Sequence, residues 1–315
     1  MKARYWFALA AAGAAALYWK RRARNPRNFR LQLEPGTEPA GDPEGSIEFI
    51  GTATTLIRFG GMTILTDPNF LHRMEQVHIG YGMHSTRLTE PSMSFDDLPY
   101  IDFVILSHMH EDHFDKRVQE RLDRNVPILT TESAARSLRE IGFARATGLS
   151  TWDRVTVTKG DTSLTITSMP ARHGPLLVSA LAMPSVMGSM LEFRNRAGEY
   201  RLYISGDTLV YNDIEEIPHR YPDIDLALLH LGGTRVLGIL VTMDAAQGIR
   251  MMEIVHPKRA IPIHYDDYDV FKDSLENFKR AVVEAGLQQK VRYLDRGDRY
   301  EFSTRAAHEL EDLRV

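Results

Sequence analysis

The chain has no cysteine among its 315 residues. This absence excludes disulfide bonds, catalysis by a thiolate and metal sites with cysteine ligands. Basic residues are not in excess either, because 38 Lys and Arg stand against 42 Asp and Glu, for a net charge of −4. Such a balance gives no electrostatic footprint for nucleic acid. Any bound metal must therefore use nitrogen and oxygen ligands, and we expect no nucleic-acid partner.

Long uncharged runs are scarce too, with one exception near the N-terminus. Residues 5–19 read YWFALAAAGAAALYW and have aromatic residues at both ends, as in segments that meet a membrane interface. A helix of this length is shorter than the hydrocarbon core of a bilayer, but the flanking Arg4, Lys20 and Arg21 could reach the interface. We predict that residues 1–24 form a membrane anchor.

The charges beside this segment predict its orientation. The run KRRARNPR (20–27) follows it, and its basic residues outnumber Lys2 and Arg4 on the other side. By the positive-inside rule, the domain that follows should face the cytoplasm. The small residues of AAAGAAA (10–16) would also suit a cleaved signal peptide, so export after cleavage is the alternative. The oligomeric state stays open.

The remaining chain predicts a linker, one domain and a tail. Residues 25–45 are rich in proline, glycine and glutamate, as linkers are; the domain covers 46–302 and the tail 303–315. Apolar runs at 46–51, 54–60 and 62–67 predict a meander. Further strands are expected at 102–107, 154–158, 162–169, 189–194, 200–205, 225–230 and 259–263, and helices at 132–142, 243–255 and 270–286. This order predicts an α/β (α+β) domain whose mixed sheets are covered by helices.

The stretch SHMHEDHFD (107–115) carries the strongest chemical signal. It begins where the buried strand 102–107 ends, and His108 and His110 would point the same way in an extended segment. Asp112 and His113 follow as the chain turns toward a helix. Neutral imidazole and carboxylate suit zinc, iron or manganese. We interpret the stretch as a metal site rather than as an incidental polar loop.

Three more candidate ligands follow expected strands. They are His173 in SMPARHG, Asp207 in YISGDT and His264 in AIPIHY. Loops at strand ends often carry functional groups on a rigid scaffold. Each residue alone could be a loop histidine or a capping aspartate, but together they predict a shared cleft.

With these residues in place, the chain resembles the metallo-β-lactamase superfamily over roughly residues 46–302. Five stretches are similar to one branch, which contains the ascorbate 6-phosphate lactonase-like proteins and the N-acyl-phosphatidylethanolamine-hydrolysing phospholipase D. They are LTDP (65–68), LSHMHEDHFD (106–115), PARH (170–173), SGDT (205–208) and PIHY (262–265). The resemblance implies an αββα sandwich of two mixed sheets covered by helices, with a dinuclear metal site along one edge.

The resemblance also implies how the ligands are shared. One metal ion would be held by His108, His110 and His173, the other by Asp112, His113 and His264, with Asp207 bridging both. Zinc is the first expectation for the two divalent ions, and iron or manganese are alternatives. The chain departs from the branch in its apolar, Met-rich segment 174–190 and in His230, where the branch has a proline-containing stretch. These departures bear on the substrate.

The chemistry expected of such a site is hydrolysis. Two divalent ions bridged by a solvent oxygen lower its pKa and supply hydroxide near neutral pH. Asp112 could also orient that hydroxide or shuttle its proton. His230 could donate to a substrate oxyanion or be a structural histidine, and Asp67 could hydrogen-bond a ligating residue or only form the turn before Pro68.

The apolar segment 174–190 points to the substrate. Met183 and Met187 could line a wall for an acyl group or pack in the core, and Tyr265 could face the metals or the core. Together with the anchor, this predicts a phospholipase D-like phosphodiesterase that acts on a lipid-like or apolar phosphodiester. A lactonase or other ester hydrolase is the alternative, and a non-catalytic, metal-stabilised binding protein is another.

Overall fold

The computed structural model describes residues 25–34, 44–79, 84–160, 162–195 and 198–304. The predicted anchor over residues 1–24 and nearly all of the predicted tail lie outside these ranges. Among the described residues, no helix is both long enough and apolar enough to span a bilayer.

The first of two large sheets has seven strands in the order β18-β2-β3-β4-β7-β8-β9. Its strands are β2 (Glu44–Gly51), β3 (Thr54–Phe59), β4 (Met62–Thr66), β7 (Phe103–Ile105), β8 (Ile128–Thr131), β9 (Ala146–Leu149) and β18 (Arg299–Ser303). The predicted meander is present as the antiparallel strands β2, β3 and β4. From β4 through β9 the neighbours are parallel, so the sheet is mixed.

The second sheet also has seven strands, in the order β1-β10-β11-β12-β13-β14-β17. They are β1 (Asn28–Gln32), β10 (Arg154–Lys159), β11 (Thr162–Met169), β12 (Gly188–Asn195), β13 (Gly198–Ile204), β14 (Leu226–His230) and β17 (Arg259–Ile263). The strands β10 to β13 are antiparallel neighbours, whereas β13, β14 and β17 are parallel.

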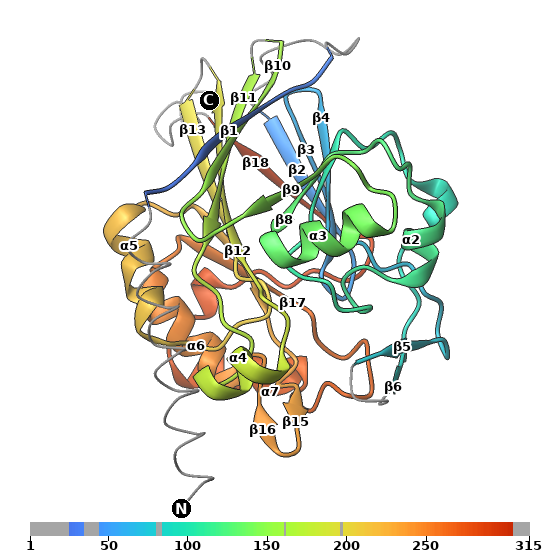
Figure 1. The fold of residues 1–315 in the computed structure, drawn as a ribbon. Helices are drawn as coiled ribbons and strands as arrows, with labels where there is room; N and C mark the ends of the chain where they lie inside the picture. The colour runs from blue at the N-terminus through green and yellow to red at the C-terminus, as the bar shows by residue number, and fades with distance from the viewer. Residues whose placement is uncertain (1–24, 35–43, 80–83, 161, 196–197, 305–315) are drawn as a thin grey trace, which may run out of the picture.

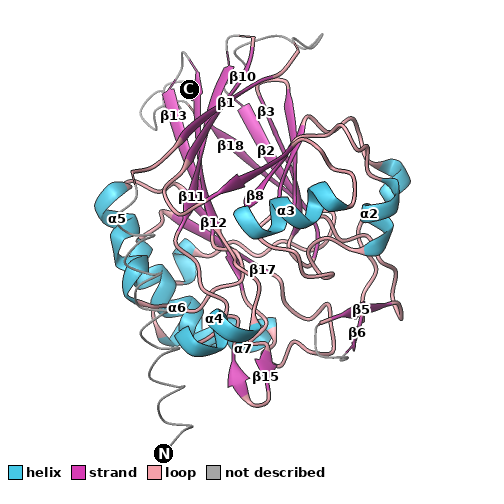
Figure 2. Cartoon of the chain, in the orientation of Figure 1, coloured by secondary structure: helices cyan, strands magenta, loops and turns pink. Residues whose placement is uncertain are grey.

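The two sheets face one another with helices on both outer faces (Figures 1 and 2). The main core lies between the sheets and includes Ile57, Phe193 and Leu228. On the first sheet, α2 (Lys116–Arg121) and α3 (Glu132–Glu140) bury residues such as Val118 and Leu138. On the second, the helices are α5 (Glu216–Arg220), α6 (Ala245–Val255) and α7 (Leu275–Glu284). This arrangement is the predicted αββα sandwich.

The segment predicted as a linker includes a strand. Residues Asn28–Gln32 form β1, which pairs in parallel with β10 at the edge of the second sheet. Arg27 fixes its start, because its backbone N–H and guanidinium donate to the buried carboxylate of Asp153 over 2.6–2.9 Å. The proline- and glycine-rich composition did not reveal this pairing, which depends on a partner more than 120 positions away.

Two short hairpins and one short helix lie near one end of the sandwich. The hairpins are β5 (Gln76–His78) with β6 (His84–Thr86), and β15 (Arg235–Val236) with β16 (Ile239–Leu240). Part of the apolar segment 174–190 forms α4 (Leu176–Ala182), an addition to the predicted elements. In Figure 1, α4 and the β15–β16 hairpin lie at the same end of the molecule.

Candidate metal centre

The candidate ligands converge where strands of both sheets end. His108 follows β7 in the first sheet, and His173, Asp207 and His264 follow β11, β13 and β17 in the second. The strand β7 is buried throughout, and the last three residues of β13 and the last four of β17 are buried, so the strand ends that lead to the ligands are held by the core. The four strand ends predicted to share one site therefore do so.

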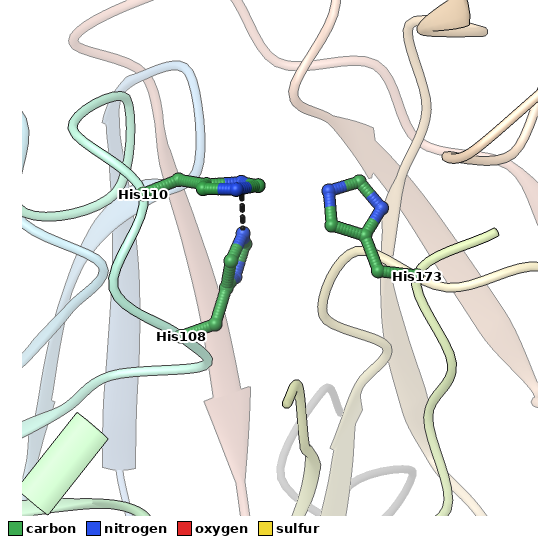
Figure 3. A group of neighbouring side chains, drawn as sticks. All are labelled: His108, His110 and His173. Atoms are coloured by element: carbon green, nitrogen blue, oxygen red, sulfur yellow. Dashed lines mark hydrogen bonds between the residues drawn. The ribbon is translucent and has the colours of Figure 1, made fainter. Parts of the chain in front are cut away.

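Three histidines form the first group (Figure 3). Nε2 of His108 lies 2.9 Å from Nδ1 of His110, and His173 faces this pair from the other sheet, with its ring centroid 5.2–5.3 Å from theirs. One nitrogen from each ring lies within 4.8 Å of the other two. Nδ1 of His173 is 2.8 Å from the carbonyl oxygen of Val241, which leaves Nε2 for the group.

A second group contains Asp112, His113 and His264. Its ligand atoms also lie within 4.8 Å of one another. Oδ2 of Asp112 is 3.5 Å from Nε2 of His264 and 3.8 Å from Nε2 of His113. Nδ1 of His264 is 3.1 Å from the carbonyl oxygen of Leu231. As in His173, a backbone acceptor on Nδ1 orients Nε2 toward the group.

Asp207 lies between the two groups. Its Oδ2 is 3.8 Å from Nε2 of His173 in the first group and 3.5 Å from Nε2 of His113 in the second. Its Oδ1 is 3.6 Å from Nε2 of His264. One carboxylate thus faces imidazole nitrogens of both groups, which is where the resemblance placed a bridging ligand.

Burial and charge set the pKa values of the histidines. Burial lowers the pKa of His108 far below its usual value and that of His110 to about 4, and neighbouring imidazoles add to the effect. Burial opposes charge on His113 and His264 as well, but Asp207 and Asp112 outweigh it and raise the pKa of both. The first group thus presents neutral imidazoles, the form that binds metals.

The donor set fits metal ions. Within the described part of the chain, four buried atoms of this site have no hydrogen-bond partner: Nε2 of His113, His230 and His264, and Oδ1 of Asp112. Buried polar atoms are nearly always satisfied in folded proteins. Cations held by these nitrogen and oxygen atoms would satisfy the ligands among them, and the set suits zinc, iron or manganese.

Asp67 lies behind the site and hydrogen-bonds Ser107, the residue next to His108, rather than a candidate ligand itself. Its Oδ1 accepts hydrogen bonds from the backbone N–H and the hydroxyl of Ser107, at 2.7 and 2.9 Å. Its Oδ2 lies 3.6 Å from Nδ1 of His113. The Ser107 hydroxyl is also 3.0 Å from Nδ1 of His108. Asp67 and Ser107 therefore position ligands of both groups. Ser107 was not among the residues predicted from the sequence.

His230 contacts Asp207 rather than solvent. It is fully buried at the end of β14, and its Nδ1 is 3.1 Å from Oδ1 of Asp207. Thr242 donates from its hydroxyl to Oδ2 of the same carboxylate over 3.1 Å. Through Nδ1 the residue orients Asp207, and its Nε2 has no hydrogen-bond partner, so donation from Nε2 to a substrate oxyanion stays a prediction. Thr242 had no signal in the sequence, because an isolated threonine is common in loops.

The three predicted substrate-wall residues differ in placement. Met187 is 2% exposed and belongs to the main core between the sheets. Tyr265 packs in the same core, and its hydroxyl donates to the carbonyl of Leu294 over 3.3 Å. Both therefore follow the core-packing alternative. Met183 is partly exposed just after α4 and stays a candidate, together with the exposed leucines of that helix.

Comparisons with known proteins agree with this fold. The Beta-lactamase superfamily domain matches residues 63–265. A UPF0173 metal-dependent hydrolase of Nanoarchaeum equitans is 26% identical over 199 residues, which cover 62% of this chain and 84% of that protein. Among solved structures, a possible metal-dependent hydrolase from Veillonella parvula has a TM-score of 0.70 at 19% identity, covering 83% of this chain and 99% of that one. The isothiocyanate hydrolase from Delia radicum gut bacteria has a TM-score of 0.69 at 21% identity, covering 82% and 99%.

The chain belongs to the β-lactamase superfamily, since the family match covers more than half of it. The αββα fold, the histidine- and aspartate-lined site and the family define a metal-dependent hydrolase of the metallo-β-lactamase superfamily, as predicted. The finer resemblance, to the lactonase-like and phospholipase D branch, stays a prediction.

Proposed function

We propose that this chain is a dinuclear metal-dependent phosphodiesterase that acts on a lipid-like phosphodiester. One observation carries the dinuclear part: the Asp207 carboxylate faces Nε2 of His173 at 3.8 Å and Nε2 of His113 at 3.5 Å. A carboxylate shared between two ligand groups suits two ions close together, the arrangement of many enzymes that cleave phosphate esters. The proposed ions are divalent, zinc first, with iron and manganese as alternatives.

The residues of the metal centre would have separate roles in such a reaction. Bound at the two groups, divalent ions would activate water and neutralise charge that develops on the phosphoryl oxygens. Asp112 is turned toward His264 through Oδ2, and its Oδ1 has no hydrogen-bond partner. When Oδ2 binds the ion, Oδ1 would orient the attacking water. His230 and Thr242 keep Asp207 in place through the contacts described above.

Charge next to the site favours an anionic substrate over a neutral lactone. Arg172 precedes His173 and is partly exposed, and its guanidinium lies 4.1 Å from the centre of the Tyr211 ring. A guanidinium stacked in this way is preorganised for phosphate recognition. This positive charge beside a metal ligand would contact the phosphodiester group.

Apolar surface next to the site favours a substrate with an acyl chain. Helix α4 begins three residues after His173, and its Leu176 and Leu177 are 49% and 47% exposed. Exposed leucines there could bury the methylenes of a substrate, each worth about 0.8 kcal/mol. We also propose that residues 1–24 anchor the chain in a membrane with the catalytic domain in the cytoplasm, which would bring the site close to lipids.

A panel of substrates tests the proposal. For the metal-loaded protein, we expect kcat/KM to rise with the acyl length of a phosphodiester series, by up to about fourfold per buried methylene. A lactone, an N-acyl amide and an isothiocyanate should react more slowly. Leu177→Ser should flatten the dependence on chain length and leave the rate for the shortest phosphodiester unchanged, whereas Tyr100→Ser, at a distant exposed position, should change neither.

Each other result selects a different function. Faster opening of the lactone, with no response to chain length, would favour the lactonase or ester hydrolase. Turnover of none of these compounds by a fully metal-loaded protein would favour the metal-stabilised binding protein. Loss of activity on long and short substrates alike in Leu177→Ser would mean that the leucine supports the fold rather than the substrate.

A further inference from the structure

The β15–β16 hairpin carries a leucine that is not buried in any core of the described chain. Leu237 is 93% exposed at the hairpin tip, and it forms the two-residue loop with Gly238 between Val236 and Ile239. Both loop residues have positive φ, 50° for Leu237 and 80° for Gly238. Asn, Asp or Gly is strongly preferred in such a turn, and a branched side chain there is unfavourable. Contacts within the chain therefore do not account for a leucine at this position.

Helix α4 adds more apolar surface beside this tip. Its Leu176, Leu177 and Leu181 are 49%, 47% and 70% exposed, and Ile239 of β16 is 41% exposed. With Leu237, these make five of the ten large apolar side chains that are exposed in the described ranges. Scattered exposed leucines are ordinary, but a concentration on two short elements marks an interaction site.

The two elements are joined at the metal centre. His173, which precedes α4, contacts the carbonyl oxygen of Val241, which follows β16, through Nδ1 at 2.8 Å. Gly174 packs against the same valine so closely that an added Cβ would lie 3.2 Å from its side chain. The exposed apolar side chains of α4 and the hairpin therefore belong to the end of the sandwich that carries His173. Figure 1 shows the two elements at this same end.

The strand register shows where the N-terminal segment joins the domain. Asn28 of β1 pairs with Arg154, and Arg154 pairs with Thr167 of β11. Since β11 ends at Met169 and leads to His173, β1 begins at the metal end of the second sheet. The connecting residues 20–27 span at most about 28 Å when extended. A bilayer that holds residues 5–19 would thus lie within reach of this end.

We propose that the hairpin tip and α4 dock onto the lipid bilayer in which the N-terminal segment is held, with Leu237 inserted among the acyl chains. The inference rests on the proposed membrane anchor and deepens the proposed lipid substrate. Docking would present the metal centre to lipids at the bilayer surface, so that a substrate need not leave the membrane fully before it reaches the site. The occupant of the apolar surface is the bilayer, not a protein.

Cysteine labelling of the full-length chain tests this directly, because the natural sequence has no cysteine. Leu237→Cys and, as a control, Tyr100→Cys would each carry an environment-sensitive fluorophore in phosphatidylcholine–phosphatidylglycerol vesicles. Tyr100 is 81% exposed and precedes β7, at the sheet end opposite the metal ligands. We expect quenching by bromine-labelled acyl chains to be at least about fivefold stronger at position 237 than at position 100.

Flotation of the vesicles separates the docking from the anchor and from the enzyme activity. Co-flotation with equal, weak quenching at both positions would overturn the docking and leave the anchor standing. A chain that does not co-float would overturn both. Shielding of the position 237 label without lipid, rising with protein concentration, would identify a second copy as the occupant and reject the bilayer. Metal content and hydrolysis of a short, soluble phosphodiester are independent of all these outcomes.

A second variant tests the consequence for the substrate. Leu237→Asn keeps the turn, since Asn suits positive φ, and removes the apolar tip. We expect it to hydrolyse a soluble short-chain phosphodiester at the wild-type rate and a vesicle-embedded one about tenfold more slowly, because insertion of a leucine is lost. Equal rates on vesicles would contradict the docking.

Discussion

At the scale of single residues, the site depends on side chains that orient the ligands. Asp207 accepts from His230 at Oδ1 and from Thr242 at Oδ2, both at 3.1 Å. The His230 ring also lies nearly parallel to those of His113 and His264, with centroids 5.8 and 5.5 Å away. A histidine at this position therefore holds the proposed bridging carboxylate without itself facing solvent.

Replacement of His230 should weaken metal binding more than it weakens the fold. His230→Ala removes a donor to Asp207, and loss of such an outer-shell partner typically costs about 10–100-fold in metal affinity. His230→Asn, which keeps a nitrogen donor near the Nδ1 position, should recover part of this loss. Competition with a chelator measures the affinity, and thermal unfolding of the metal-free chains serves as the control. Unchanged affinity in His230→Ala would show that Asp207 needs no such partner.

At the scale of elements, β1 shows how a contact between residues far apart in the sequence can fix a segment at the edge of a sheet. Arg27 donates through its backbone and side chain to Asp153, which is 1% exposed on its side chain. Burial alone would raise the pKa of Asp153, but the hydrogen bonds and charge of Arg27 outweigh it and lower that pKa. The carboxylate is thus more stable as an anion in the folded chain than in the unfolded one.

The Arg27–Asp153 pair should make the free energy of unfolding depend on pH. Because the folded-state pKa of Asp153 is lowered, its stabilisation is complete above the ordinary pKa of aspartate, about 4, and is lost as the pH falls through the lowered value. We expect Asp153→Asn to reduce the free energy of unfolding at pH 7 by about 1–3 kcal/mol. The difference from wild type should shrink below pH 4, as urea unfolding would measure.

A surface pair provides the control for this experiment. Asp96 forms an ion pair with Arg121 in which both side chains are largely exposed. Asp96→Asn should change stability by less than about 1 kcal/mol at either pH. An equal effect of the two substitutions would show that the Arg27–Asp153 contact does not hold β1 in the sheet.

At the scale of the whole molecule, the metal centre joins the two sheets. The first sheet supplies the histidines and Asp112 of the stretch after β7, and the second supplies His173, Asp207 and His264. Cations bound to both sets would connect the halves of the sandwich. Ions that bind the folded chain alone also stabilise it, by about 2.7 kcal/mol at a concentration 100 times the Kd.

Metal analysis should therefore find close to two transition-metal ions per chain, and their removal by a chelator should lower the melting temperature. Asp207→Ala should reduce metal content and hydrolysis together, because one carboxylate serves both groups. Asp96→Asn should leave both unchanged. Elemental analysis that detects no metal after reconstitution with zinc, manganese and iron would contradict the site, and full activity in Asp207→Ala would contradict the bridge.

Much of this organisation could be read from local sequence pattern. Apolar runs between glycine-containing turns marked the meander β2–β4, and the run before His108 marked β7, since burial on both faces leaves a continuous apolar signature. Histidines and aspartates directly after such strands predicted the ligand groups, because parallel strands end at one edge of a sheet. These signals are local, so one sequence suffices to see them.

Only the tertiary structure decided what distant residues do to one another. The strand β1 pairs with β10, and Arg27 meets Asp153 at its start, whereas composition alone made the same residues look like a linker. Met187 and Tyr265 are core residues. The sequence did not decide this, because an apolar or aromatic side chain near a ligand can point toward the metal site or toward the core. The roles of Ser107, His230 and Thr242 follow from hydrogen bonds to Asp67 and Asp207. Polar side chains acquire such roles from direction and distance in space, which spacing along the chain does not encode.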